Sequence, residues 1–186
     1  MNITDYLGAK HGKDPALTTA VRELGTWIGT SGNNLVYGGS KAGLMGELAE
    51  SVLQAGGKVL GIEPQFFIDM GLEYPAITKL IVTKDMAERK ALLIANGDAF
   101  ITFPGGTGTL EEISEVLSKL CLGHLDAPCL IYNLNGYYDH LQALLNHMVE
   151  MELVDPKKLK NVRFVSSLAE IKDILAWHSQ FRKNEI

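Results

Sequence analysis

The stretch from residue 99 to residue 112 reads Ala99-Phe100-Ile101-Thr102-Phe103-Pro104-Gly105-Gly106-Thr107-Gly108-Thr109-Leu110-Glu111-Glu112. Its start is a nearly continuous apolar run, which is typical of a strand buried on both faces of a sheet. A glycine-rich turn follows. Apolar residues then recur at spacings of three and four, which predicts a helix near 108–122 with an inward stripe of Leu110, Ile113, Val116, Leu117 and Leu120. A buried strand, a turn and a helix in this order form the repeating unit of an α/β fold.

The same unit recurs along the whole chain. Short apolar runs predict strands near 2–7, 34–38, 58–62, 77–83, 98–103, 128–133 and 162–166. Stretches with helical period predict helices over 17–28 and near 42–55, 84–96, 108–122, 135–150 and 167–180. We therefore expect a three-layer α/β fold, with a mostly parallel sheet of about seven strands flanked by helices on both faces. The length of 186 residues predicts a single domain over 1–186, with 181–186 as a frayed tail.

Composition excludes several classes of function. The formal net charge of −5 argues against a nucleic-acid or anionic-membrane partner. The two cysteines, Cys121 and Cys129, form no CxxC motif, and the five histidines show no ligand spacing, so we expect no disulfide framework, metal or cofactor. The chain starts without the basic and apolar regions of a secretory signal and contains no apolar stretch of about 18 residues, which predicts a cytoplasmic protein.

Two glycine-rich loops follow predicted strands, and ligands of open α/β sheets bind at the carboxyl ends of strands. The first loop reads Gly38-Gly39-Ser40-Lys41-Ala42-Gly43-Leu44-Met45-Gly46. It fails the GxGxxG pattern because Ser40 stands at the second glycine, so a dinucleotide site has weak support. Gly38 and Gly39 would allow a ligand close to the backbone, whereas the alternative is a tight turn with small-residue packing. Met45 is more simply interpreted as a core residue.

The second loop, 104–109, enters a helix directly. Free backbone N–H groups and the positive end of the helix dipole make an anion site without any lysine, which suits an acidic protein that binds phosphate. Thr107 and Thr109 add hydroxyl groups, and a plain turn is the alternative.

Glu112, Arg89 and Lys90 are the charged candidates. Thr109-Leu110-Glu111-Glu112 matches the capping box T-x-x-E, so Glu112 is either a helix cap or a functional carboxylate. Arg89 and Lys90 lie between Met86 and Leu93 on the predicted helix, and one interpretation is that both stems pass the sheet edge to water. The other is that the guanidinium of Arg89 faces the same cavity as Glu112, because the strand that follows this helix leads directly into the Pro104 loop.

These residues carry a family resemblance. Arg89-Lys90 followed by the run 104–112 resembles the PGGxGTxxE signature and upstream arginine of the LOG family, the cytokinin riboside 5′-monophosphate phosphoribohydrolases. Many members have been labelled possible lysine decarboxylases. The likeness covers most of the chain, including the Gly8 loop, Gly38-Gly39 through Gly46, Gly61-Ile62 with Pro64, and Asn133 with Gly136-Tyr137-Tyr138. Departures from the family pattern occur at Leu7-Gly8-Ala9-Lys10, Ser40 and Lys119.

The resemblance implies a Rossmann-like homodimer that binds a nucleotide in cytokinin biosynthesis. Its reaction would be hydrolysis of the N-glycosidic bond of an adenine-type nucleoside 5′-monophosphate, either a cytokinin riboside monophosphate or AMP, to free base and ribose 5-phosphate. The catalytic pair maps onto Arg89 and Glu112. The substrate-binding candidates are Gly38, Gly39, Lys90, Gly105, Gly106, Thr107, Gly108, Thr109 and Glu111.

Two other functions stay open. The first is a non-catalytic nucleotide-binding or carrier protein, in which Glu112 would be only a helix cap. The second is a decarboxylase, which needs a Schiff-base lysine for pyridoxal phosphate, and Lys41 and Lys90 are the lysines near the loops. Because one domain leaves no second domain to close over a substrate, we also expect a partner subunit to supply part of the pocket wall.

Overall fold

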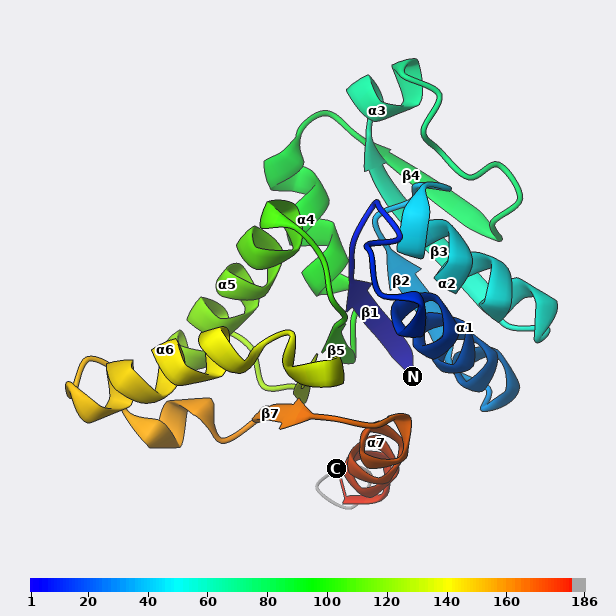
Figure 1. The fold of residues 1–186 in the computed structure, drawn as a ribbon. Coiled ribbons are helices and arrows are strands. Elements are labelled where there is room, and N and C mark those ends of the chain that lie inside the picture. Colours follow the sequence, from blue (N-terminus) through cyan, green and yellow to red (C-terminus); the bar gives the residue numbers. More distant parts are fainter. Residues whose placement is uncertain (182–186) are drawn as a thin grey trace.

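The computed structural model describes residues 1–181, and their seven strands form one parallel sheet in the order β4-β3-β2-β1-β5-β6-β7 (Figure 1). Each neighbouring pair runs parallel, so the predicted sheet is confirmed. The strands are β1 Asn2–Tyr6, β2 Asn34–Tyr37, β3 Lys58–Pro64, β4 Lys79–Thr83, β5 Ala99–Thr102, β6 Cys129–Tyr132 and β7 Val162–Val165.

The predicted helices are present, with differences at their ends. They are α1 Pro15–Thr30, α2 Gly43–Gln54, α3 Gln65–Asp69, α4 Met86–Ala95, α5 Thr107–Leu122, α6 Asp139–Glu150 and α7 Leu168–Phe181. The helix predicted over 135–150 is wrong at its start: a 3₁₀ turn, η1 (Leu134–Gly136), precedes α6, because Asn135 and Gly136 adopt left-handed φ angles of 51° and 75°. Two elements were not predicted, α3 and the 3₁₀ turn η2 (Pro156–Leu159), because such short segments carry no detectable period. Apart from Phe181, the tail predicted to fray lies outside the described residues.

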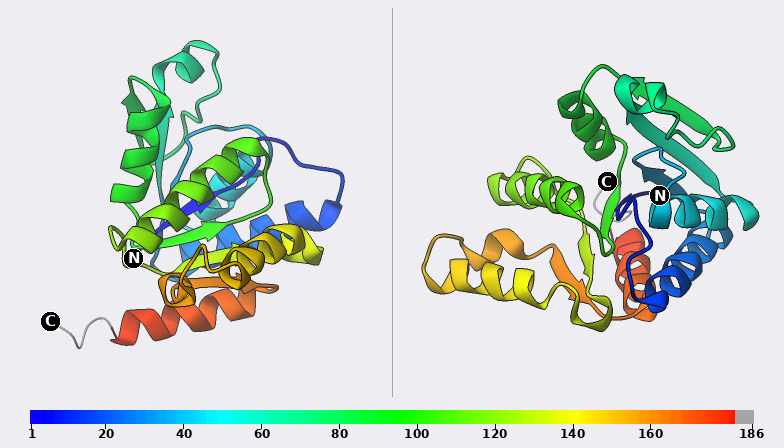
Figure 2. Two further views of the ribbon diagram at one scale, coloured as in Figure 1. Left: turned by 90° about the vertical axis from the view of Figure 1, so that its left-hand side faces the viewer. Right: turned by 45° about the horizontal axis from the view of Figure 1, so that its top comes forward.

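Helices cover both faces of the sheet and bury a core against each. On one face α1, α2 and α7 pack over side chains that include Leu35, Ile101 and Phe103. On the other face α4, α5 and α6 pack over Val36 and Phe100. Figures 1 and 2 show α1 and α2 on the side opposite α4 and α5, and α7 beside α1. Successive strand residues therefore reach different cores, which explains the continuous apolar runs of the sequence.

The order of the strands fixes where a ligand can enter. From β1 the chain moves outward through β2 and β3 to β4 at one edge, and α4 then brings it back to β5, which pairs with the other side of β1. The loops after β1 and β5 therefore leave the sheet on opposite faces. This reversal is the topological switch point at which open α/β sheets bind ligands.

Candidate active site at the switch point

A cavity of about 560 Å³ lies at the carboxyl ends of β1 and β5. This volume is in the range of small-molecule sites, roughly 300–1,000 Å³. Its wall is built from the loop after β1, from Gly38 after β2, and from residues 104–109 after β5. Side chains of the surrounding helices complete it, among them Met45, Phe67 and Met86.

Backbone contacts tie these loops together. The Gly8 N–H donates to Pro104 O at 3.2 Å, and the Met45 N–H donates to Gly8 O at 3.3 Å. Gly105 must lack a side chain, because a Cβ there would overlap the Thr109 hydroxyl and lie 3.0 Å from the Gly8 nitrogen. The cavity wall is thus fixed by main-chain packing between three segments that are distant in sequence.

The start of α5 faces the cavity with free polar groups. Gly106 is the N-cap, and no side chain accepts a hydrogen bond from the first turn in the described structure. Gly106, Thr107 and Gly108 are exposed and line the cavity together with buried Thr109. The first-turn N–H groups and the helix dipole therefore provide a site for an anion.

Arg89 and Glu112 meet in this cavity and are almost fully buried. Arg89 Nη1 lies 2.7 Å from Glu112 Oε1, and their side chains are 8% and 10% exposed. The guanidinium also donates from Nε to Ile62 O at 3.0 Å and from Nη2 to Gly38 O at 3.4 Å. Groups from β3, α5 and the loop after β2 therefore hold this cation, and the alternative in which its stem passes the sheet edge to water is wrong.

The capping-box interpretation of Glu112 is also wrong. Because α5 begins at Thr107 after the N-cap Gly106, Glu112 lies in the second turn and cannot reach back to the N-cap amide. Burial raises the pKa of Glu112, and the neighbouring Arg89 opposes that shift. The carboxylate is therefore a buried group whose charge depends on one cation.

Lys90 points to a different set of partners. Its Nζ lies 2.7 Å from Glu111 Oε1 and 3.4 Å from Glu115 Oε2, outside the cavity. The hydrogen bond to Glu111 raises the pKa of the Lys90 ammonium. Gly39 is likewise absent from the cavity wall of the described residues, and it packs against Glu63. Glu111 is also absent from the described cavity wall. The remaining candidates line the cavity: Gly38, Arg89, Gly105, Gly106, Thr107, Gly108, Thr109 and Glu112.

The sequence does not mark several of the residues that line or border the cavity. Met45 belongs to the core as predicted, and it lines the cavity as well. Tyr137 donates from its hydroxyl to Gly105 O at 2.5 Å across the cavity rim. Phe67 comes from the unpredicted helix α3. No sequence signal marks these contacts, because each joins a side chain to a segment that is distant along the chain.

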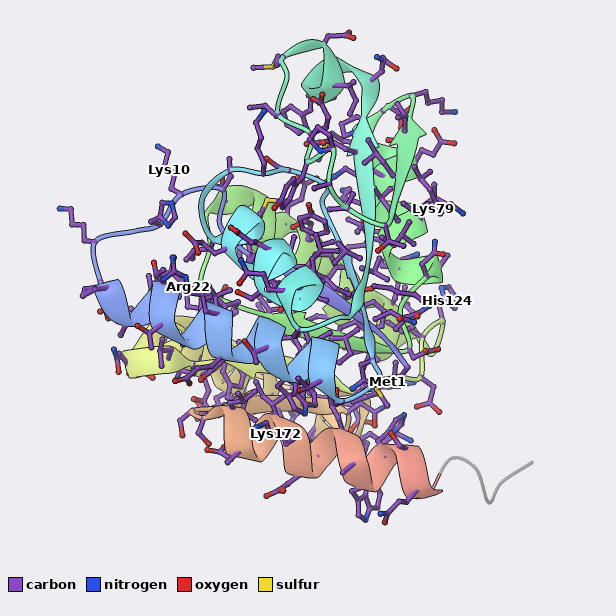
Figure 3. All side chains as sticks on the ribbon, turned by 90° about the vertical axis from the view of Figure 1, so that its right-hand side faces the viewer. Met1, Lys10, Arg22, Lys79, His124 and Lys172 are labelled. Atoms are coloured by element: carbon purple, nitrogen blue, oxygen red, sulfur yellow. The ribbon has the colours of Figure 1, made fainter. Side chains whose placement is uncertain are left out.

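A second hollow of about 580 Å³ lies between α1 and α7. Figure 3 labels two of its residues, Arg22 and Lys172, on these two helices. No glycine loop or candidate site residue contributes to it. Within residues 1–181, no group of three or more His, Cys, Asp or Glu side chains is arranged to hold a metal ion, and no helix is long and apolar enough to cross a membrane.

Comparison with known protein families agrees with this geometry. The family described as "Possible lysine decarboxylase" matches residues 45–175, a span that holds Arg89, the glycine turn and Glu112. The chain belongs to this family, the LOG family. A protein of Rhodococcoides fascians named cytokinin riboside 5′-monophosphate phosphoribohydrolase is 38% identical over 156 residues, which cover 83% of this chain and 79% of that protein. An Arabidopsis thaliana protein of the same name is 37% identical over 153 residues, covering 82% and 67%.

Solved structures of other proteins share the fold of this LOG family member. The molybdenum cofactor carrier protein of Chlamydomonas reinhardtii superposes with a TM-score of 0.69 at 20% identity, over 94% of this chain and 98% of that chain. The molybdenum cofactor binding protein of Rippkaea orientalis gives a TM-score of 0.68 at 22% identity, over 94% and 96%. At these identities the likeness concerns the fold alone.

Proposed function

We propose that this protein hydrolyses the N-glycosidic bond of an adenine-type nucleoside 5′-monophosphate, releasing free base and ribose 5-phosphate. The observation that carries the proposal is the buried Arg89–Glu112 pair, which lines the same cavity as the uncapped start of α5. The first turn of α5 suits a phosphate, and Glu112 presents a carboxylate to the same cavity. The names of the relatives at 37–38% identity support the same reaction.

The first role of the site is to anchor the 5′-phosphate. With a net charge of −5 the protein offers no general attraction to anions, so the first-turn amides of α5 and the hydroxyls of Thr107 and Thr109 would hold the phosphate. Lys10, an exposed residue that lines the cavity, adds one cation. Binding energy from this remote group would favour the reacting geometry at the sugar.

The second role is to stabilise the charge that develops on the sugar. As the bond from C1′ to the base nitrogen breaks, its electron pair leaves with the base, and positive charge develops on C1′ and the ring oxygen. The Glu112 carboxylate would stabilise that charge and accept a proton from the water that attacks C1′. That proton would then pass to the departing base, which leaves as the neutral free base and restores the carboxylate. Arg89 would hold Glu112 in its ionised form, because it opposes the effect of burial on the pKa of this carboxyl group.

The alternatives fit the site less well. A Schiff-base lysine needs a lowered pKa, whereas Glu111 raises the pKa of Lys90, and the exposed Lys41 does not belong to the described cavity wall. A carrier protein in which Glu112 only caps a helix disagrees with the position of Glu112 in the second turn of α5.

A product assay tests the proposal. The purified protein is incubated with AMP, with isopentenyladenosine monophosphate, and with adenosine, which lacks the 5′-phosphate. We expect equal amounts of free base and ribose 5-phosphate from one or both nucleotides, and far slower cleavage of adenosine. No base release above that of the Glu112→Gln variant from any nucleotide would overturn it.

We also infer a cytoplasmic homodimer in which the partner completes the pocket. Leu110, at the first turn of α5, and Tyr137, at the cavity rim, are 48% and 50% exposed, which is unusual for large apolar side chains beside a polar site. The unpaired state of Cys121 and Cys129 is compatible with a reducing compartment. Sedimentation of the active protein tests the dimer, and a fully active monomer would exclude it.

A further inference from the structure

Strand β3 ends with a buried acid that the proposed reaction does not use. Glu63 is 1% exposed, and its Oε2 has no hydrogen-bond partner among the described residues. In the sequence it interrupts an apolar strand run, Val59-Leu60-Gly61-Ile62. An unpaired buried carboxyl group destabilises a fold, so a specific neighbour is expected to compensate for its burial.

Two consecutive glycines bring this acid next to Arg89. At Gly39 an added Cβ would lie 2.9 Å from Glu63 Cβ and 3.1 Å from Glu63 Oε2. At Gly38 an added Cβ would overlap the guanidinium of Arg89. Arg89 Nε also donates to the carbonyl of Ile62, the residue directly before Glu63. The Gly38-Gly39 turn therefore makes room for both side chains on adjacent residues.

Opposing effects act on the pKa of Glu63. Burial raises its pKa to about 7, Arg89 opposes this shift, and Glu73 adds to it. Tyr37 also lies near Glu63: its buried hydroxyl has no partner among the described residues, and burial together with Glu63 raises its pKa. Tyr74, which also acts on Tyr37, donates its N–H to Gly39 O. Glu63 forms no ion pair among the described residues, but Arg89 lies near enough to lower its pKa, and the same cation pairs with Glu112.

We propose that Glu63 is a positioning residue for the proposed reaction: in its ionised form it attracts the guanidinium of Arg89 and so keeps Glu112 in place against the substrate. While Glu63 is neutral, the guanidinium is held only by Glu112 and by the carbonyls of Gly38 and Ile62. Once Glu63 is ionised, its charge adds to that hold on Arg89. Glu112, which is joined to Arg89 at 2.7 Å, is then fixed where its carboxylate faces the developing positive charge.

The pH profile of kcat for base release tests this proposal, which rests on the proposed function. In the wild type, kcat should rise through an ionisation near pH 7. Glu63→Gln should remove that rise and lower kcat at pH 8 by about tenfold, with KM changed by less than about twofold, as expected for a misplaced catalytic group. Glu63→Asp, which keeps the charge, should retain the rise.

The matched control is Glu73→Gln. This variant removes the neighbouring acid that raises the pKa of Glu63, so the rise should move to lower pH while the plateau stays unchanged. It also keeps the test valid if Glu63→Gln does not fold. A rise that persists at the same pH in Glu63→Gln, or that does not move in Glu73→Gln, would overturn the proposal.

A stability measurement separates failure of this proposal from failure of the proposed function. Because the folded pKa of Glu63 is raised, its protonated form stabilises the fold, and the melting temperature should fall as the pH rises toward about 7. Glu63→Gln should abolish this fall, and Arg89→Met should extend it to higher pH. If no base is released at any pH but this pattern holds, only the proposed function fails. If Arg89→Met leaves the titration of Glu63 unchanged, the interaction between Glu63 and Arg89 is refuted.

Discussion

Replacing Arg89 with methionine would leave Glu112 buried without its cation. The two side chains are 8% and 10% exposed, and they are joined at 2.7 Å. Removing one partner of a buried ion pair destabilises a protein by about 3–5 kcal/mol when the other partner stays charged. Glu112 can avoid this loss by taking up a proton, because burial without Arg89 raises its pKa further.

The loss should therefore depend on pH with a definite sign. Between the pKa of Glu112 in the unfolded chain and its raised value in the folded variant, the native state binds more protons than the unfolded state. The contribution of Glu112 to the free energy of unfolding of Arg89→Met should fall as the pH rises, by at most about 1.4 kcal/mol per pH unit. At pH 5 the variant should be closest to the wild type, and at pH 8 farthest from it.

Urea denaturation of the wild type, of Arg89→Met and of Arg89→Met/Glu112→Gln at pH 5, 6.5 and 8 measures this effect. Glu63 titrates in both variants, so the difference between them reports Glu112 alone. The double variant should be less sensitive to pH than the single variant. An equal loss at pH 5 and pH 8, or identical pH slopes in both variants, would refute the account of Glu112 as a buried carboxylate held in its charged form by Arg89.

Three further substitutions test the cavity wall. In Gly105→Ala the new methyl group would overlap the Thr109 hydroxyl, so we expect the free energy of unfolding to fall by about 1–3 kcal/mol and nucleotide binding to weaken in calorimetry. An unchanged melting temperature would contradict the packing described. Tyr137→Phe removes the hydrogen bond to Gly105 O and should lower stability by about 0.5–1.5 kcal/mol while raising KM, and an unchanged KM would show that this contact does not shape the loop. Lys90→Met breaks the pairs with Glu111 and Glu115 and should change stability by about 0–1 kcal/mol in denaturation, whereas a larger loss would mean that Lys90 has a structural role beyond these pairs.

The sheet was predictable because an apolar run in the local sequence marks each strand. Runs such as 99–103 and 129–132 are apolar throughout, and the helices between them have a clear period. The break before α6 was not predictable from period alone, because it depends on the left-handed backbone of Asn135. The single short turn of α3 has no period to detect.

The site was predictable in part for a similar reason. The glycine turn and Glu112 lie within one short segment, so the sequence alone indicates that they are close in space. The pairing of Arg89 with Glu112 followed from topology, since α4 leads into β5 and the loop after β5 opens α5. Gly38 lines the cavity, whereas Gly39 does not belong to the described cavity wall. These glycines make room for Arg89 and Glu63, and only a three-dimensional structure reveals which side chains come to fill that space.

The central claim is that the Glu112 carboxylate performs the hydrolysis, and the turnover of Glu112→Gln tests it most directly. Glu115→Gln is the matched control, because Glu115 lies one turn farther along α5 and pairs with Lys90 and Lys119 outside the cavity. With saturating nucleotide, kcat for release of free base should fall by about 10²- to 10⁴-fold in Glu112→Gln and stay near the wild-type value in Glu115→Gln. A folded Glu112→Gln variant that releases base at a rate close to that of the wild type would contradict the claim.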